Sequence, residues 1–366
     1  MVVGCGALGN EVIKNLALIG VGNIVIVDFD NVEQHNLSRS VLFSKKEEAV
    51  GIPKVNVIAE AVRKINPELN LRVINGDICA DVGLGLIRTM DVLISCVDNR
   101  WARYSINRLC MRAGIPWIDA GISELEGTVR IFEPEKNCYA CALSADDMAQ
   151  MKKRFSCAGN IKRALKTESA PTTCIIASII GGVQTQEALK LIHNKYSESE
   201  KFETLSGKMF VYDGKHLTTS TVRFEIYDDD CSLHQQWLPV SKSDISENTI
   251  IRDALFQIKK QLSVGDPYLI LINDCFVDYI FDKETDKKYR VMMPGRKVEE
   301  FIKYSPELGK KPVSSYYQNE IYEFHLDSPY LEMTLNEIGI PNQDVIKVRC
   351  VSDGSFSEKD FFIEMK

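Results

Sequence analysis

Short hydrophobic runs alternate with longer amphipathic stretches through the first third of the chain. Runs with the length of buried β-strands lie at 24–27, 71–74, 92–97, 117–121 and 128–132. Stretches with the hydrophobic spacing of α-helices lie at 10–20, 53–66 and 100–114. This alternation predicts an α/β fold with a doubly wound, mostly parallel sheet that has helices on both faces.

The pattern changes toward the second half of the chain. A helix from residue 174 to 192 and a hairpin at 208–213 and 220–227, around Gly214, complete the α/β part, and shorter alternating runs follow residue 237. We therefore predict two domains, residues 1–235 and a smaller α+β domain at 236–366. Residues 330–341 resemble the late part of a β-grasp fold; an unrelated α+β appendage is the alternative.

Composition narrows the class of protein. The chain has 366 residues, 45% of them hydrophobic and 26% charged, and a net charge of −7. An acidic chain without a long basic run argues against nucleic acid as the main partner. No apolar run is long enough to span a bilayer and no signal peptide is visible, so we expect a cytoplasmic protein.

A glycine loop opens the chain. Gly4, Gly6 and Gly9 form a G-x-G-x-x-G turn between a strand and a helix, where backbone N–H groups can approach phosphates. Asp28 ends the next strand, where a carboxylate can accept hydrogen bonds from ribose hydroxyls. The pair predicts adenosine binding, with an incidental glycine turn as the alternative.

Charged residues after this loop point to a triphosphate. Arg39 and Lys54 are candidate phosphate ligands, and Arg103 is either a third one or a surface position. Asp98 follows the run at 92–97, at the edge of the sheet where a carboxylate can hold Mg²⁺ between phosphates.

These residues belong to longer motifs that together resemble one family. The motifs are D-x-D-x-V-x-x-x-N-L-x-R from Asp28, G-x-P-K ending at Lys54, C-V-D-N at 96–99 and a C-x-x-C at 138–141. They resemble the adenylation domain of ubiquitin-activating, E1-like enzymes and of the bacterial adenylyltransferases of the ThiF superfamily that act on sulfur carriers. The resemblance implies that Asp28 and Asp30 contact the nucleotide, that Asn36, Arg39 and Lys54 bind its phosphates, and that Asp98 binds Mg²⁺.

The same resemblance implies a reaction and its partners. The C-terminal glycine of a ubiquitin-like protein would attack the α-phosphate of ATP, and the acyl group would pass to a cysteine and then to a conjugating enzyme recruited by the C-terminal domain. A homodimer is implied as well. The alternatives are a sulfur-carrier adenylyltransferase without a thioester step and the inactive scaffold half of a heterodimeric activating enzyme; a nicotinamide-dependent dehydrogenase is the remaining one.

A zinc site is expected from two cysteine-containing pairs. Cys138 and Cys141 have the two-residue gap that lets both thiolates reach one tetrahedral Zn²⁺. Cys231 and His234 have the same gap and lie where the family often carries a second C-x-x-C, so His234 is a departure from the family pattern. Reduced cysteines in a loop are the alternative.

The thioester cysteine has two candidates among the eleven cysteines of the chain. Cys157 lies in a basic segment whose cations would lower its pKa. Cys174 lies at a helix start, which also favours the thiolate, but the apolar residues after it predict burial. We therefore favour Cys157 as the catalytic residue.

The start of the chain departs from the family. Relatives carry an arginine-bearing helix before the first strand, often acting on the neighbouring subunit, whereas this sequence begins at Met1 in the first strand. We expect the chain as written to adenylate weakly.

Overall fold

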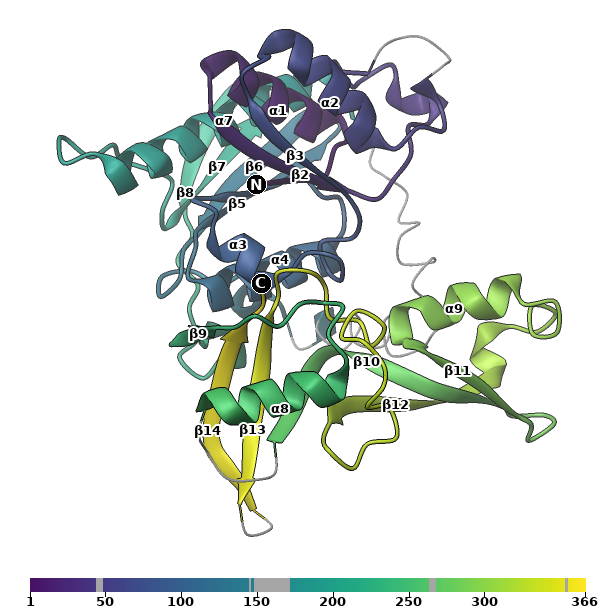
Figure 1. Cartoon of the computed structure of the whole chain (residues 1–366). Helices are drawn as coiled ribbons and strands as arrows, with labels where there is room; N and C mark the ends of the chain where they lie inside the picture. Colours follow the sequence, from purple (N-terminus) through teal and green to yellow (C-terminus); the bar gives the residue numbers. More distant parts are fainter. Residues whose placement is uncertain (44–48, 145, 148–171, 263–267, 353–354) are drawn as a thin grey trace. The chain divides into compact units, whose positions relative to one another are not determined.

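The first unit is built on an eight-stranded sheet with the strand order β3-β2-β1-β4-β5-β6-β7-β8 (Figure 1). The computed structural model describes residues 1–43, 49–144, 146–147, 172–262, 268–352 and 355–366. Pairing from β3 through β5 is parallel, and pairing from β5 through β8 is antiparallel. The strands are Val2–Val3 (β1), Asn23–Asp28 (β2), Asn70–Asn75 (β3), Leu93–Ser95 (β4), Trp117–Ser123 (β5), Glu126–Phe132 (β6), Lys208–Asp213 (β7) and Thr218–Arg223 (β8).

Helices cover both faces of this sheet. The long α7 packs against α1, β5 and β6, and Figure 1 shows α4 on the opposite side of the sheet from α1, α2 and α7. The helices are Ala7–Ile19 (α1), Lys54–Ile65 (α2), Arg100–Ala113 (α4) and Cys174–Tyr196 (α7), and the short helix Leu84–Arg88 (α3) is divided between the two units. The predicted doubly wound α/β fold is thus confirmed.

Two glycines end helices where the hydrophobic spacing predicted it. Gly20 and Gly114 lie in the left-handed region, with φ of 88° and 72°, and their N–H groups bond to carbonyls of α1 and α4. Glycine adopts this conformation without steric cost, which fixes the C-termini of both helices. None of the described helices is long and apolar enough to cross a membrane.

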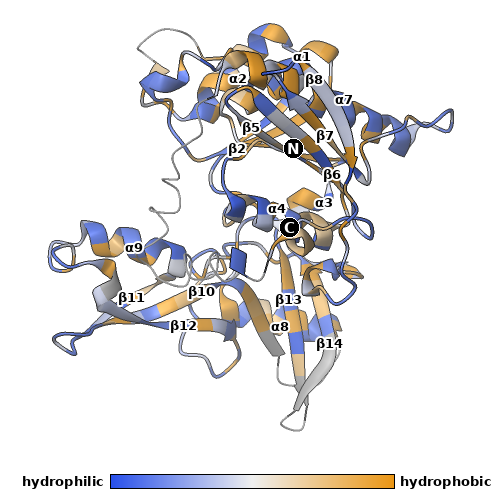
Figure 2. Ribbon diagram, turned by 180° about the vertical axis from the view of Figure 1, so that it is seen from behind, coloured by the Kyte–Doolittle hydropathy of each residue, from blue (hydrophilic) through white to orange (hydrophobic). Residues whose placement is uncertain are grey.

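The core of this unit lies between the sheet and its helices. Fully buried Trp117 and Phe132 come from neighbouring strands and stack with their ring centroids 4.5 Å apart. Figure 2 shows hydrophobic residues gathered in α1 and along the strands of the sheet, with hydrophilic residues spread over the loops. This buried layer holds the strand ends, and the loops that follow them, in fixed positions.

The second unit contains the described residues of Ala80–Leu86 and Trp237–Lys366. Its sheet has the order β11-β10-β13-β14-β9, and β12 pairs with β10. Helix α8 packs on β10, and α9 packs on β10 and β11. The elements are Val240–Lys242 (β9), Ile251–Leu262 (α8), Tyr268–Asp282 (β10), Lys288–Pro294 (β11), Gly295–Tyr304 (α9), Tyr316–Phe324 (β12), Val345–Ser352 (β13) and Ser355–Glu364 (β14).

This topology confirms a second α+β sheet unit and specifies its connections. The last strand, β14, pairs in parallel with the first, β9, as the first and last strands of a β-grasp do. Among the described residues of the unit, however, β9 is the one strand before α8, where a β-grasp has a hairpin. Residues 330–341 form turns that lead toward β13.

Candidate nucleotide site and metal cluster

The glycine loop connects β1 to α1 at the point where the strand order of the sheet reverses. Gly4 has a φ of +93°, and a Cβ atom there would lie 2.5 Å from the carbonyl oxygen of Cys96. A Cβ atom on Gly9 would lie 2.0 Å from the carbonyl oxygen of Gly4. Gly6 is the N-cap of α1 and has no side chain to cap the helix, and no atom of the described part of the chain lies within 4 Å of the position a Cβ would take. The uncapped start of α1 is the feature that binds anions in this class of loop.

Two glycine variants are expected to separate packing from binding. Gly9→Ala must displace the Gly4 backbone, so we expect it to destabilise the fold by about 1–3 kcal/mol, the usual cost of overpacking. The methyl group of Gly6→Ala has no atom of the described residues within 4 Å, so this variant is expected to keep the wild-type melting temperature while weakening ATP binding. Thermal unfolding and ATP titration of both variants test this. A Gly9→Ala chain as stable as wild type would contradict the packing argument.

Asp28 is tied to the glycine loop by backbone hydrogen bonds. Its Oδ2 accepts from the N–H of Cys5 at 2.6 Å, and its Oδ1 accepts from the N–H of Asp30 at 2.8 Å. Burial raises the pKa of Asp28, while the charge of Lys54 and the two hydrogen bonds oppose the rise. The carboxylate is therefore held at the carboxyl end of β2, in contact with the glycine loop.

Lys54 begins helix α2 and reaches back to the same strand end. Its Nζ lies 2.7 Å from Oδ2 of Asp30, and the residue is 9% exposed. Burial alone would lower the pKa of Lys54, but the charges of Asp28 and Asp30 outweigh it, so the net shift is upward. The ammonium group thus stays protonated at neutral pH beside the glycine loop.

Asn10 is a site residue that the sequence analysis missed. Its side chain is fully buried, its Nδ2 donates to the carbonyls of Cys5 and Gly6 at 2.9 Å each, and its Oδ1 accepts from the N–H of Leu42 at 2.9 Å. The asparagine joins the glycine loop to the segment that carries Arg39. The position of Asn10 directly after the last glycine of the G-x-G-x-x-G loop could have identified it from the sequence.

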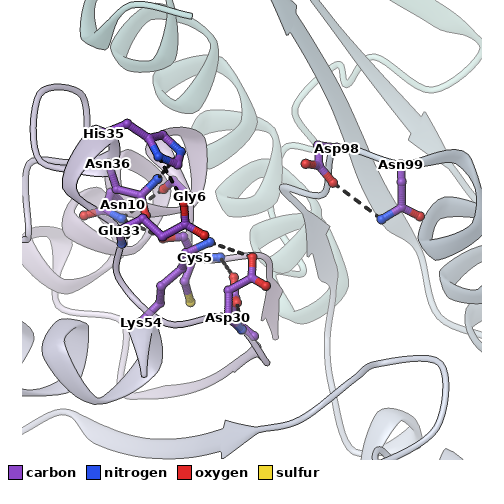
Figure 3. A network of polar contacts seen from close by, with 11 residues as sticks. Cys5, Gly6, Asn10, Asp30, Glu33, His35, Asn36, Lys54, Asp98 and Asn99 are labelled. Atoms are coloured by element: carbon purple, nitrogen blue, oxygen red, sulfur yellow. Dashed lines mark hydrogen bonds and ion pairs between the residues drawn. The ribbon is translucent and has the colours of Figure 1, made fainter. Parts of the chain in front are cut away.

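The remaining predicted nucleotide ligands lie around this network. Asn36 accepts from the N–H of Glu33 at 2.9 Å, and Arg39 donates from Nη1 to Oγ1 of Thr172 at 3.3 Å. Asp98 follows β4 and is exposed, and its Oδ1 lies 3.4 Å from Nδ2 of Asn99. Figure 3 shows Asp98 and Asn99 on a loop of their own, apart from the Lys54–Asp30 pair.

Arg103 has a different environment from the one expected for a phosphate ligand or a surface residue. Its Nε donates to Oδ1 of fully buried Asp119 at 2.7 Å, and its Nη2 donates to two backbone carbonyls. The guanidinium is engaged by the protein itself because strand β5 places an acidic group beneath helix α4.

The four predicted zinc ligands come together. One ligand atom each from Cys138, Cys141, Cys231 and His234 lies within 4.8 Å of all the others. Two short 3₁₀ turns, Ala140–Ala142 and Ser232–His234, carry Cys141 and His234, and Cys231 is the residue just before the second turn. Three thiolates and one imidazole are an ordinary ligand set for structural Zn²⁺, and four protein ligands leave no open position.

Neighbouring side chains hold this cluster in place. Asn107 of α4 donates from Nδ2 to Sγ of Cys138 at 3.2 Å and accepts from the N–H of Tyr139 at 3.0 Å. The ring of Tyr227 stacks on His234 with centroids 3.9 Å apart. Such surrounding contacts orient metal ligands, so the donor set and its support both fit zinc.

Of the two candidate nucleophiles, Cys174 lies within the described residues and Cys157 does not. Cys174 is the first residue of α7, after the N-cap Thr173, and it is exposed. The predicted burial of Cys174 is wrong, because the apolar residues that contact the core begin at Ile176. Cys157 lies outside the described residues.

Comparison with known proteins identifies the family of this chain. Residues 1–233 match the ThiF family, and the chain belongs to this family. It is 29% identical over 229 residues to the SAMP-activating enzyme E1 of Haloferax volcanii, covering 63% of this chain and 77% of that protein. It is 31% identical over 215 residues to the molybdopterin-synthase adenylyltransferase of Salmonella typhimurium, covering 58% of this chain and 78% of that protein.

Two further matches cover smaller shares of the proteins concerned. The chain is 32% identical over 178 residues to SUMO-activating enzyme subunit 2 of Dictyostelium discoideum, covering 48% of this chain but 25% of that protein. A crystal structure of E. coli MccB with succinimide has a TM-score of 0.49 and 26% identity, covering 63% of this chain and 65% of that chain.

Proposed function

We propose that this chain is an ATP-dependent adenylyltransferase that activates the C-terminal glycine of a ubiquitin-like protein. The observation that carries the proposal is the contact network of Asp28, Asp30 and Lys54 around the glycine loop. Relatives named as an E1 enzyme and as an adenylyltransferase support the same reaction class.

The reaction joins two anions, so its main requirements are alignment and charge neutralisation. A carboxylate oxygen of the terminal glycine attacks the α-phosphorus of ATP, the bond to the bridging oxygen breaks, and pyrophosphate leaves with that electron pair. The Asp28 carboxylate accepts hydrogen bonds from the ribose hydroxyls, and Asn36, Arg39 and Lys54 contact the phosphates. Asp98 supplies an oxygen ligand for Mg²⁺, which would neutralise phosphate charge when bound.

A second step, transfer of the acyl group to a cysteine, is the finer part of the proposal. The thiolate of Cys157 attacks the acyl carbon, a thioester forms, and AMP leaves. Cys174 is the alternative, and its exposure at the start of α7 supports it, because an exposed thiol is accessible to the acyl-adenylate. Zn²⁺ held by the Cys138 cluster has a structural role in either case.

Gel analysis with ATP, Mg²⁺ and small proteins ending in glycine tests both steps. We expect an adduct that thiols remove, that Cys174→Ala retains and that Cys157→Ala abolishes. The reverse pattern would assign the thioester to Cys174. Adenylate without any thiol-sensitive adduct would instead identify a sulfur-carrier adenylyltransferase. If neither adenylate nor adduct forms, the inactive scaffold half of a heterodimeric enzyme is the alternative that fits.

The partners follow from this assignment. The thioester would pass to a conjugating enzyme, and we propose the unit at residues 236–366 as the part that recruits it. A homodimer of this chain in the cytoplasm is the proposed state.

A further inference from the structure

The loop that carries Asp98 is fixed on both sides of that residue. Before it, the N–H of Cys96 donates to the carbonyl of Val3 at 2.7 Å, and the carbonyl of Val97 accepts from Nη2 of Arg103 at 2.9 Å. After it, Asn99 caps helix α4 by accepting from the N–H of Ala102 at 2.8 Å. Within residues 96–99, Asp98 is exposed and its three neighbours are half-buried.

The same loop contacts the glycine loop directly. The carbonyl oxygen of Cys96 would lie 2.5 Å from a Cβ atom on Gly4, so the two backbones meet where the glycine has no side chain. A shift of residues 96–98 would therefore change the spacing between Asp98 and the start of α1. The start of α1 is the proposed contact of the ATP phosphates, and Asp98 is the proposed contact of their magnesium ion.

The side chain of Arg103 connects the Asp98 loop to strand β5. Its three hydrogen bonds run to Oδ1 of Asp119 at 2.7 Å, to the carbonyl of Val97 and, at 3.1 Å, to the carbonyl of Ala120. Its side chain is 15% exposed and that of Asp119 is fully buried. A planar guanidinium can make these bonds at once in a fixed fork, whereas the ammonium of lysine is a point charge.

The charges around Arg103 keep its guanidinium protonated. Asp119 also pairs with Arg130 at 2.5 Å, so two cations share one buried carboxylate. Burial would lower the pKa of Arg103, but Asp119 and, more weakly, Asp98 outweigh it and raise the pKa. The guanidinium therefore remains charged.

We propose that Arg103 is a positioning residue, which fixes the backbone at Val97 so that the Asp98 carboxylate is presented to the magnesium ion of bound ATP. This inference rests on the proposed function. It assigns Arg103 to the support of the cation site and gives it no contact with the phosphates. Losing the bond leaves the Val97 carbonyl without its charged donor and frees the Asp98 loop to move.

Titration of ATP binding against magnesium concentration tests the assignment without any protein substrate. Calorimetry on the wild-type chain, Arg103→Gln and Arg103→Lys would give the Mg²⁺ concentration for half-maximal stimulation of ATP binding. We expect both variants to need about tenfold more Mg²⁺, the size expected for losing one charged hydrogen bond. ATP affinity in excess EDTA should match that of wild type.

Arg130→Gln is the matched control. It removes the other partner of Asp119 but no bond to Val97, so it should lower the melting temperature and leave the Mg²⁺ dependence within about twofold of wild type. Arg103→Lys serves if Arg103→Gln fails to fold. If Arg103→Lys has the Mg²⁺ dependence of the wild-type chain, a positive charge at this position is sufficient and the proposal of a positioning role is overturned.

Three other results would also overturn it: wild-type Mg²⁺ dependence in Arg103→Gln, an equal shift in Arg130→Gln, or Mg²⁺-independent ATP binding by the wild-type chain. The proposed function fails separately. If the chain binds Mg²⁺-ATP but makes no adenylate with any glycine-terminated protein, the proposed function is refuted. The effect of Arg103 on the Mg²⁺ dependence of ATP binding can still be measured in that case.

Discussion

The Lys54→Ala variant is expected to form adenylate about 100-fold more slowly than the wild-type chain, the usual loss when one donor to a charged transition state is removed. The pentavalent α-phosphorus and the departing pyrophosphate both carry negative charge. Lys54 is positioned for this task because Asp30 holds its Nζ at 2.7 Å and its side chain is 11% exposed. In such a partly buried site, water screens the ammonium charge little.

The pH dependence follows from the charges around Lys54. Asp28 and Asp30 raise its pKa above the ordinary value of 10.5, so the ammonium is protonated throughout the neutral range. Loss of this proton therefore sets no limit on the rate between pH 7 and 9. A rate that falls across this range would show that a different group titrates.

Lys14→Ala is the matched control for Lys54→Ala. Lys14 pairs with Glu11 on α1, so its replacement removes one positive charge and one ion pair but leaves the Lys54–Asp30 pair in place. We expect wild-type adenylation from this variant, measured as pyrophosphate exchange into ATP. Equal losses in the two variants would mean that net charge, and not the position of Lys54, is responsible.

The Cys138→Ser variant is expected to lose its bound zinc and to melt at least about 10 °C below the wild-type chain. A serine hydroxyl does not replace a thiolate ligand, and the binding energy of structural Zn²⁺ is also folding energy. The loss should be large because the cluster joins residues 138–141 to residues 231–234, almost a hundred positions apart. Metal analysis by mass spectrometry and thermal unfolding measure the two effects.

Cys174→Ser serves as the control for the metal site. Cys174 is exposed at the start of α7 and is not part of the cluster of four ligands. The account requires one zinc ion per chain in this variant and in the wild type. Full zinc content in Cys138→Ser would show that the metal is bound elsewhere or that the cluster is a set of reduced thiols.

The sequence predicted those parts of the structure that depend on local patterns. Hydrophobic periodicity located helices α1, α2 and α4, and the glycines after α1 and α4 ended them by adopting a left-handed conformation. The C-x-x-C spacing grouped Cys138 with Cys141, because two ligands on one turn must reach the same point. Each of these features is decided by residues a few positions apart.

Features that depend on distant partners were not predictable in the same way. The environment of Arg103 is decided by Asp119 on the neighbouring strand, and the exposure of Cys174 by which face of α7 meets the sheet. The place of Ala80–Leu86 in the second unit also has no local signal. There, the N–H of Leu84 donates to Asp344, which lies 260 residues later.

Carrier-dependent pyrophosphate exchange tests the central claim most directly. The chain would be incubated with ATP, Mg²⁺, labelled pyrophosphate and, in turn, purified ubiquitin-like and sulfur-carrier proteins that end in glycine. We expect exchange into ATP that requires one such protein, disappears when its terminal glycine is deleted, and falls about 100-fold in Lys54→Ala. A chain that binds Mg²⁺-ATP yet shows no exchange with any of these proteins, or exchanges equally well without them, would contradict it.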